Sequence, residues 1–268
     1  MTTAALPTTA GIGLARGAVE LRQFFRQKDQ VIFTFTLPAF LLVLLGSIFD
    51  DVYPGGVSVG QVFAASMIGA GIVSTSFVNL GTGVALDRED GTLKRLRGTP
   101  MPPTAYFVGK IVLVAVASLA EVVLLLAVGM ALYDLSLPTE AARWFTFAWV
   151  FVLSVISCAL LGIAISGIAR SAQSAGAVTQ LPFIALLFMS GVYIPIAGLP
   201  DWMLQVGSLF PIKWAAQGFR SVFLPDSMMA QEAAGSWELG TTALMLGAWC
   251  VIGLVLCLAT FRWTNRRS

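Results

Sequence analysis

Six long apolar runs divide the chain, and short polar segments separate them. The runs cover about 31–49, 60–85, 107–133, 144–169, 174–194 and 240–261. A helix of about 20 apolar residues is long enough to cross a bilayer. The pattern therefore predicts an all-α membrane protein, in which residues 1–268 form a single transmembrane domain with six transmembrane helices.

Residues 12–28, before the first run, have the periodicity of an amphipathic helix. The apolar face carries Leu14, Ala18, Leu21 and Phe25, and the opposite face carries Arg16, Glu20, Gln23 and Gln27. A basic amphipathic helix directly before a span most simply lies in the membrane interface. We expect an interfacial helix that anchors the chain, helps to dock a partner, or does both. Its charged residues are Arg16, Glu20, Arg22 and Arg26.

The long loop before the last run contains two shorter apolar pieces, 200–209 and 211–224. Each begins with a proline, which suits the first turn of a helix. Neither piece can cross a hydrocarbon core about 30 Å thick. We therefore predict two short re-entrant helices within about 199–224, packed on protein. The polar residues 226–238 that follow are expected to form a solvated outer loop.

The charged residues indicate an orientation. Because 57% of the chain is hydrophobic and its mean hydropathy is +0.84, a soluble domain is excluded. If both termini lie in the cytoplasm, thirteen of the sixteen basic residues lie on the cytoplasmic side, and only Arg143, Lys213 and Arg220 lie outside. Lysine and arginine are retained on that side of a membrane. The sequence thus predicts two cytoplasmic termini.

Several kinds of chemistry are excluded by the residues that the chain lacks. There is no histidine, and Cys158, Cys250 and Cys257 all lie within apolar runs. We therefore expect no catalytic residues, no metal site and no cofactor in this chain, and no nucleic-acid partner. Gly109-Lys110 is not a phosphate-binding loop, because Ile111 follows it where a hydroxyl residue is required. If ATP drives the protein, another chain must bind it.

A short charged hairpin at residues 86–110 separates the second and third runs. Asp90-Gly91 is a turn signal, Thr92 can cap a short helix, and Pro100 can end it. Leu93 and Leu96 would form a small apolar knob among Lys94, Arg95 and Arg97. Such a helix can insert into a groove of a soluble partner. The alternative is a basic inner loop that only sets topology.

Two stretches of the chain resemble a known family. The sequence REDGTLKRLRGTPMPPTAYFVGK resembles the inner loop of ABC-2-type permeases, with matches at Arg88, Glu89, Gly91, Thr92, Leu93, Thr99, Pro100, Gly109 and Lys110. The second signature of that family is similar to residues 190–223, with matches at Gly191, Pro195, Leu199, Pro200, Phe210, Pro211 and Trp214. Together with the six spans and the amphipathic start, the resemblance covers essentially the whole chain.

The resemblance implies a permease subunit of an ABC exporter in a bacterial plasma membrane. The expected partners are membrane lipid, a second permease subunit, identical or different, and a cytoplasmic ATPase that binds ATP and Mg. The re-entrant pair would shape the outer exit. The hairpin helix would couple the permease to the ATPase through Arg88, Glu89, Gly91, Thr92, Leu93, Lys94, Arg95, Leu96, Arg97 and Pro100.

The positions of the tryptophans and of polar residues within the spans give some indication of the cargo. Six of the seven tryptophans fall near span ends or in the outer loop, which favours drug-like or lipidic cargo, including glycolipid, over a long polysaccharide. Glu121 lies deep within the third span, where a carboxyl is costly and faces protein or water. With Ser76 and Asn79 it belongs either to the pathway or gate, or to structural hydrogen bonds between helices. Ser118 is a candidate partner for Glu121.

Two other classes of protein are alternatives with less support from the sequence. An ion-coupled secondary transporter or channel would need coupling carboxylates or paired repeats, and Glu121 alone supports it weakly. An intramembrane enzyme would need a catalytic cluster, which the sequence does not provide.

Overall fold

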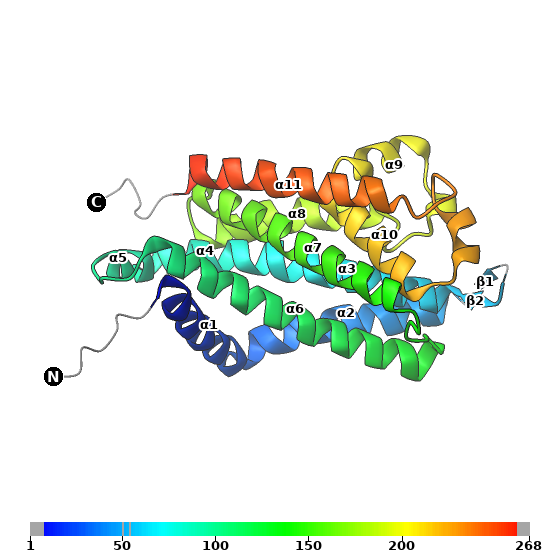
Figure 1. Cartoon of the computed structure of the whole chain (residues 1–268), viewed down its shortest axis with the longest axis horizontal. Coiled ribbons are helices and arrows are strands. Elements are labelled where there is room, and N and C mark those ends of the chain that lie inside the picture. The colour runs from blue at the N-terminus through cyan, green and yellow to red at the C-terminus, as the bar shows by residue number, and fades with distance from the viewer. Residues whose placement is uncertain (1–7, 50, 54, 262–268) are drawn as a thin grey trace.

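A computed structural model describes residues 8–49, 51–53 and 55–261, and it confirms the predicted six spans within those residues. The candidate membrane spans are α2 (Lys28–Ile48), the continuous helix Val59–Glu89, α6 (Pro103–Tyr133), α7 (Ala141–Ile168), α8 (Ala172–Met189) and α11 (Leu239–Thr260). The continuous helix consists of α3 (Val59–Val73), the π-helical η1 (Ser74–Asn79) and α4 (Leu80–Glu89). The spans run side by side in one elongated bundle (Figure 1).

Short elements occupy the two ends of the bundle. The amphipathic α1 (Thr9–Arg26) and α5 (Thr92–Arg97) lie at one end, which we call the α5 end (Figure 1). The opposite cap end carries η2 (Ile196–Gly198), α9 (Asp201–Ser208), α10 (Pro211–Phe223) and η3 (Asp226–Gln231). It also carries a hairpin of β1 (Val52–Tyr53) and β2 (Val57–Ser58), antiparallel, with Val52 paired to Ser58. The two short helices predicted in the loop before the last span are therefore present as α9 and α10.

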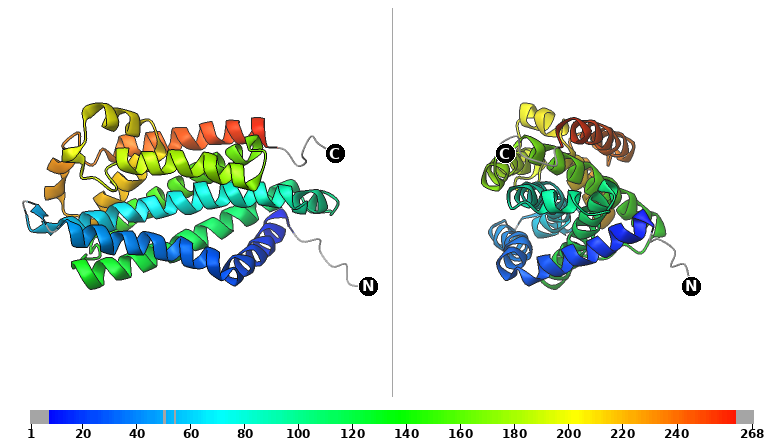
Figure 2. Two further views of the ribbon diagram at one scale, coloured as in Figure 1. Left: turned by 180° about the vertical axis from the view of Figure 1, so that it is seen from behind. Right: turned by 90° about the vertical axis from the view of Figure 1, so that its left-hand side faces the viewer.

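The helix Val59–Glu89 forms the centre of the bundle. In its most apolar window 78% of the residues are buried, against 6% for α2. Small residues allow this dense packing: a Cβ added at Gly162 of α7 would lie 2.6 Å from the carbonyl oxygen of Phe77. Such close approach of backbones is typical of helix contacts in membranes. In the end-on view of Figure 2 the helices lie in a compact group, with the blue α1 along its lower edge.

The helix α1 packs along α6 through two glycines. A Cβ at Gly13 would lie 2.6 Å from Cγ1 of Val108, and one at Gly17 would lie 2.7 Å from Cγ1 of Val112. The sequence placed Glu20 on the polar, exposed face of α1. That expectation is wrong, because Glu20 lies on the buried side of the helix and is only 6% exposed. The apolar Leu14, at 59%, remains exposed, as an interfacial helix requires.

Every residue of α10 is buried, so the cap is built around this helix. The guanidinium of Arg220 forms two hydrogen bonds with the carboxylate of Glu232, at 2.5 and 2.9 Å, and a third with Ser66 at 3.1 Å. Much of the segment 226–238 is exposed, as expected of a solvated loop, but the expectation is wrong for Met228, Glu232 and Trp237, which are buried. A buried arginine requires a charged partner, and this segment supplies it.

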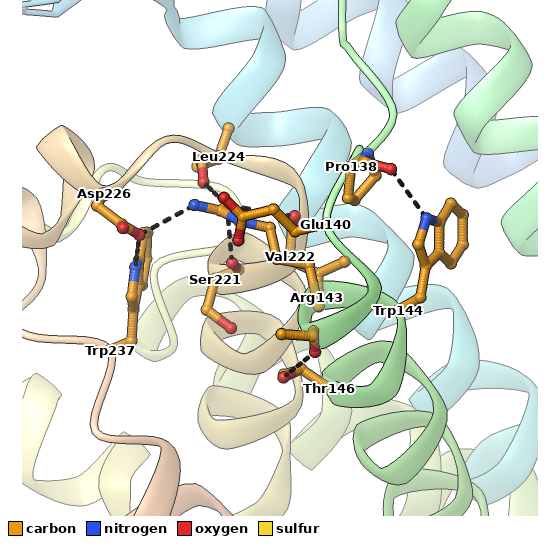
Figure 3. A network of polar contacts seen from close by, with 11 residues as sticks. Pro138, Glu140, Arg143, Trp144, Thr146, Ser221, Val222, Leu224, Asp226 and Trp237 are labelled. Carbon is orange, nitrogen blue, oxygen red and sulfur yellow. Dashed lines mark hydrogen bonds and ion pairs between the residues drawn. The ribbon is translucent and has the colours of Figure 1, made fainter.

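The carboxyl end of α10 is held by Arg143 at the start of α7, as Figure 3 shows. Its guanidinium donates to the carbonyl oxygens of Ser221, at 3.2 Å, and Leu224, and it pairs with Asp226 at 3.0 Å. These carbonyls belong to the last turn of α10, where backbone acceptors have no partner within the helix. At the other end of α10, burial lowers the pKa of Lys213, although Glu238, 3.8 Å away, acts in the opposite direction.

The ion pair within the cap predicts a non-additive effect on stability. Arg220→Met leaves the buried carboxylate of Glu232 without its partner, so we expect the free energy of unfolding to fall by about 3–5 kcal/mol. Adding Glu232→Leu removes the unpaired charge and should restore most of that loss. Denaturant unfolding of the purified protein in detergent measures both values.

The control is Arg22→Met, which removes an exposed arginine of α1 that makes no ion pair within the described residues. We expect it to change stability by less than about 0.5 kcal/mol. Equal losses in the single and double variants of the cap would contradict the role of charge burial.

Candidate functional site

The helix α5 is a short, separately capped element at the end of the bundle. The carboxylate of Asp90 accepts a hydrogen bond from the backbone N–H of Thr92 at 2.8 Å. Gly91 adopts the left-handed conformation with a φ of +78°, which a side chain would disfavour. The N-cap residue is thus Gly91, and the hydrogen bond to the first turn comes from Asp90 and not from the hydroxyl of Thr92. The helix ends at Arg97, and Pro100 follows in the connection to α6.

The outward surface of α5 is basic, and its apolar contact points inward. Lys94, Arg95 and Arg97 are exposed, whereas Leu93 is completely buried within this chain. The predicted knob of Leu93 and Leu96 is therefore wrong in one half, since only Leu96 remains partly exposed. Leu93 fixes α5 to its own bundle because its side chain packs in the hydrophobic core.

Three consecutive residues at the end of α4 bind three different parts of the chain. Asp87 pairs with Lys110 of α6 at 2.7 Å. Arg88 donates to the carbonyl oxygen of Ala169, directly after α7, at 2.6 Å. Glu89 accepts from the backbone N–H of Ala172, the first residue of α8, at 2.8 Å. We call Asp87, Arg88 and Glu89 the α4 clamp.

The α4 clamp changes how two of the sequence candidates are interpreted. Arg88 and Glu89 were expected to contact a partner, but the side-chain contacts that the structure gives them are within this chain. Arg88 is only 8% exposed. Because α5 follows α4 after a two-residue turn, any displacement of α5 acts directly on the α4 clamp.

Lys110 joins α1 to the same site. Its ammonium lies 2.8 Å from Glu20 of α1 and 2.7 Å from Asp87, and only 4% of the residue is exposed. Arg16 pairs with Glu20 at 2.5 Å, and the hydroxyl of Tyr106 donates to Asp87 at 2.8 Å. Two cations and two carboxylates therefore form one balanced network. Removal of one member would leave a buried charge unpaired, which is strongly destabilising.

Glu121 forms a second polar site, near the middle of the bundle. It is 1% exposed, and the hydroxyl of Thr75 in η1 donates to its Oε2 at 2.8 Å. Its Oε1 has no hydrogen-bond partner within the described residues, and neither has Ser118, the partner expected from the sequence. Gly71 leaves room for the carboxyl, because a Cβ there would lie 2.5 Å from Oε1. A π-helical turn such as η1 is frequent at functional sites.

The other polar candidates of η1 point elsewhere. The side-chain amide of Asn79 donates to the hydroxyl of Thr34 on α2 at 3.2 Å. Ser76 is buried, and its hydroxyl has no partner within the part of the chain that the structure describes. The structure therefore connects Glu121 with Thr75, and no hydrogen bond within the described residues connects it with Ser76 or Asn79.

A cleft of about 560 Å³ lies beside the charge network, and an apolar pocket of about 260 Å³ lies farther toward the cap end. The cleft is lined by the charged Glu20, Asp87 and Lys110, by the amides of Gln23, Gln27, Gln30, Asn79 and Gln180, and by apolar side chains that include Phe24, Val78, Leu86 and Leu113. The pocket is lined mainly by apolar side chains, including Leu37, Leu41, Phe183, Leu187 and Phe188. The sequence pattern predicts neither cavity, because α2, the central helix and α8 contribute lining residues that are far apart in the chain.

The remaining sequence candidates are distributed over the two ends. Gly191 has a φ of +72° directly after α8, and Pro195 precedes η2. Pro200 precedes α9, Pro211 begins α10, and the indole of Trp214 donates to the carbonyl oxygen of Ser208, which ties α10 to α9. At the α5 end, Arg22 and Arg26 are exposed on α1.

Comparison with known proteins identifies similar sequences. A family model described as ABC-2 type transporter matches residues 17–224. YbhR of Escherichia coli K12, named as a probable multidrug ABC transporter permease, is 23% identical over 146 residues, which are 54% of this chain and 39% of YbhR. YvfS of Bacillus subtilis, whose name describes a transport permease, is 20% identical over 193 residues, covering 72% of this chain and 77% of YvfS. The same description is carried by ycf38 of Porphyra purpurea, 23% identical over 205 residues, which cover 75% and 70% of the two chains. This chain therefore spans well under half of the Escherichia coli protein that it matches.

The charge network predicts that Lys110 holds α1 in place. Lys110→Met leaves the carboxylate of Asp87 without a cation and removes the contact of Glu20 with α6, although Glu20 keeps Arg16 as a partner. We therefore expect the amides of α1 to exchange with solvent at least about tenfold faster. Hydrogen exchange followed by mass spectrometry measures this rate. Lys94→Met is the matched control, because Lys94 is exposed on α5 and should leave α1 unchanged. Unchanged exchange in the Lys110 variant would mean that the glycine contacts alone hold α1.

Proposed function

The chain belongs to the ABC-2 type transporter family, as a non-catalytic membrane permease subunit, and from that membership we propose that it forms the translocation pathway of an exporter. A separate ATPase subunit, which binds ATP and Mg, would supply the energy. The observation that carries the proposal is the exposed basic surface of α5 together with the α4 clamp behind it.

The basic surface of α5 is suited to an acidic groove on the ATPase. Lys94 and Arg97 extend from the end of the bundle, and no ion pair within the described residues engages them. Charges left unpaired on a surface steer association with a partner of opposite sign. Arg95 is partly engaged, because it donates to the carbonyl oxygen of Asp90 at 3.2 Å. Lys94 and Arg97 are therefore the best candidates for the contact.

The α4 clamp supports a mechanical coupling from α5 to the pathway. A movement of α5 would pull on Asp87, Arg88 and Glu89, which are bonded to α6, the end of α7 and the start of α8. Through Lys110 the movement would also reach α1. Four helices could therefore respond to one displacement, which a flexible charged loop could not achieve.

We propose that the α5 end faces the cytoplasm, which also places both termini there. The distribution of lysine and arginine supports this orientation, since α1, α5 and Arg170 lie at the same end. The chain is a multi-pass membrane protein, and a bacterial plasma membrane is the location we propose. The apolar side chains of α2 and α8 are largely exposed in the single chain, so lipid and a second permease subunit are expected to cover them.

The cleft and the apolar pocket support a drug-like or lipidic cargo, including glycolipid. Both are lined by the central helix together with α2 and α8, and one relative is named as a multidrug permease. A buried carboxyl with one unpaired oxygen, Glu121, lies behind η1, where we propose that it belongs to the pathway or gate. The same residue is the observation that favours the alternative, an ion-coupled transporter or channel.

Charge reversal on α5 tests the coupling to an ATPase. In the double variant Lys94→Glu with Arg97→Glu, like charges would face each other across the contact, and each such pair costs several kcal/mol. We expect recovery of the ATPase with the purified permease to fall at least about tenfold. The amount of permease in the membrane should stay unchanged, because both side chains are exposed.

The matched control reverses two exposed basic residues at the same end of the bundle, Lys28→Glu with Arg170→Glu. Its recovery of the ATPase should equal that of the unchanged protein. Undiminished recovery and transport in the α5 variant would contradict the proposed role of α5.

Glu121→Gln tests the proposed role in the pathway. The glutamine side chain has the same size and keeps an oxygen that accepts from Thr75, so stability should change by less than about 1.5 kcal/mol. If the carboxyl acts in the pathway, ATP-driven efflux of amphiphilic dyes from cells should fall at least about threefold. Ser118→Ala is the control, because that hydroxyl makes no hydrogen bond within the described residues. Full efflux of every dye would leave Glu121 a structural role only.

A further inference from the structure

The polar cleft and the apolar pocket follow each other along three helices in the same order. On α8 the cleft is lined by Gly176 and the pocket by Phe183 and Leu187, and Gln180 lines both. On the central helix Thr75 lines the cleft and Ser74 lines the pocket. The two cavities are therefore adjacent parts of one groove, and η1 lies where they meet.

The polar part of the groove offers hydrogen bonds without a net charge. Its charged residues are already paired with one another, because Lys110 lies between Glu20 and Asp87 and Arg16 neutralises the second carboxylate. The amides that line it are largely free. Gln23, Gln27, Gln30 and Gln180 make no side-chain hydrogen bond within the described residues.

An amide donates and accepts hydrogen bonds but carries no charge. A head group with several hydroxyl or amide groups would therefore find partners in the cleft. A charged head group would find no unpaired counter-ion, and it would lose hydration when it leaves water.

The apolar part of the groove has the length of a lipid tail. Along α8 it extends from Gln180 to Phe188, and eight residues of helix rise about 12 Å. One leaflet of a bilayer has a hydrocarbon thickness of about 15 Å, half of the core. The polar cleft lies at the α5 end and the apolar pocket beyond it, which is the order of head and tail in the leaflet on that side.

We propose that this groove binds an amphiphile with an uncharged head group rich in hydroxyl or amide groups, such as a glycolipid, in the orientation that it has in the leaflet at the α5 end. The head group contacts Gln180 and the glutamines of α1 and α2, and the tail lies between α2 and α8. The inference deepens the proposed function and rests on it for the claim that the bound molecule is cargo.

Photolabelling in lipid nanodiscs tests the proposal with the full chain alone. Three lipids are compared that share the same acyl chains, with a diazirine near the tail end, and differ in the head: glucosyl, phosphatidylglycerol and trimethylammonium. The expected result is labelling of the pocket segments of α2 and α8 by the glucosyl lipid. It should exceed labelling by either charged lipid about threefold or more, the effect of one or two hydrogen bonds.

A substitution links that preference to the cleft. Gln180→Leu should lower labelling by the glucosyl lipid about two- to tenfold, the range expected for one lost hydrogen bond, and leave the charged lipids unchanged. Gln173→Leu is the matched control, because Gln173 is exposed on the same helix and does not line the cleft. The comparison of head groups in the unchanged protein remains decisive if the Gln180 variant fails to fold.

Equal labelling by the three lipids, a preference for a charged head, or labels only outside the residues that line the pocket would overturn the proposal. Absence of labelling, as expected if a second copy of the chain fills the groove, would overturn it as well. The assay contains no ATPase, so its outcome is independent of the α5 contact. Conversely, loss of head-group preference with intact recovery of the ATPase would refute this inference alone.

Discussion

The buried ammonium of Lys110 is the interaction on which the α5 end of this protein depends. It satisfies Glu20 of α1 and Asp87 of α4 at once, from a position on α6 that water barely reaches. Three helices must keep their relative positions for these charges to stay paired, because an unpaired charge there is far more costly than a lost surface contact. Glycines at the α1–α6 contact make the approach possible, and the ion pairs then fix it.

The same charges are part of a larger set of contacts that connects the helices at the α5 end. The α4 clamp extends the connection from Asp87 to the end of α7 and the start of α8, so α5 is attached to a network and not to a flexible loop. On α5, the exposed side chains of Lys94 and Arg97 make no ion pair with this network. The cap end uses the same principle, since Arg220 and Glu232 hold the buried α10. The groove between these ends is lined by α2 together with α4, α6 and α8, which the α4 clamp connects.

Several details differed from the sequence expectations for one reason, the direction of a side chain. Leu93 and Leu96 lie three residues apart, but the bundle covers the first completely and the second only in part. Glu121 has Ser118 one turn away on its own helix, yet its hydrogen bond comes from Thr75 on another. Glu232 lies in a polar segment that was expected to be a solvated loop. It is buried because it pairs with the buried guanidinium of Arg220. Each outcome depends on a neighbour that is distant in sequence.

The sequence by itself determined the six spans, the amphipathic start, the two short helices of the cap and the family, because apolar length, helical periodicity and proline positions act locally. It also marked Arg88, Glu89 and Lys110 as important. Tertiary structure alone decided which parts of the chain these residues contact, that four charges at the α5 end cancel, and that glutamines from three helices line one cleft. Pairing of charges and shape of cavities depend on distances between helices, and a linear pattern of residues does not contain those distances.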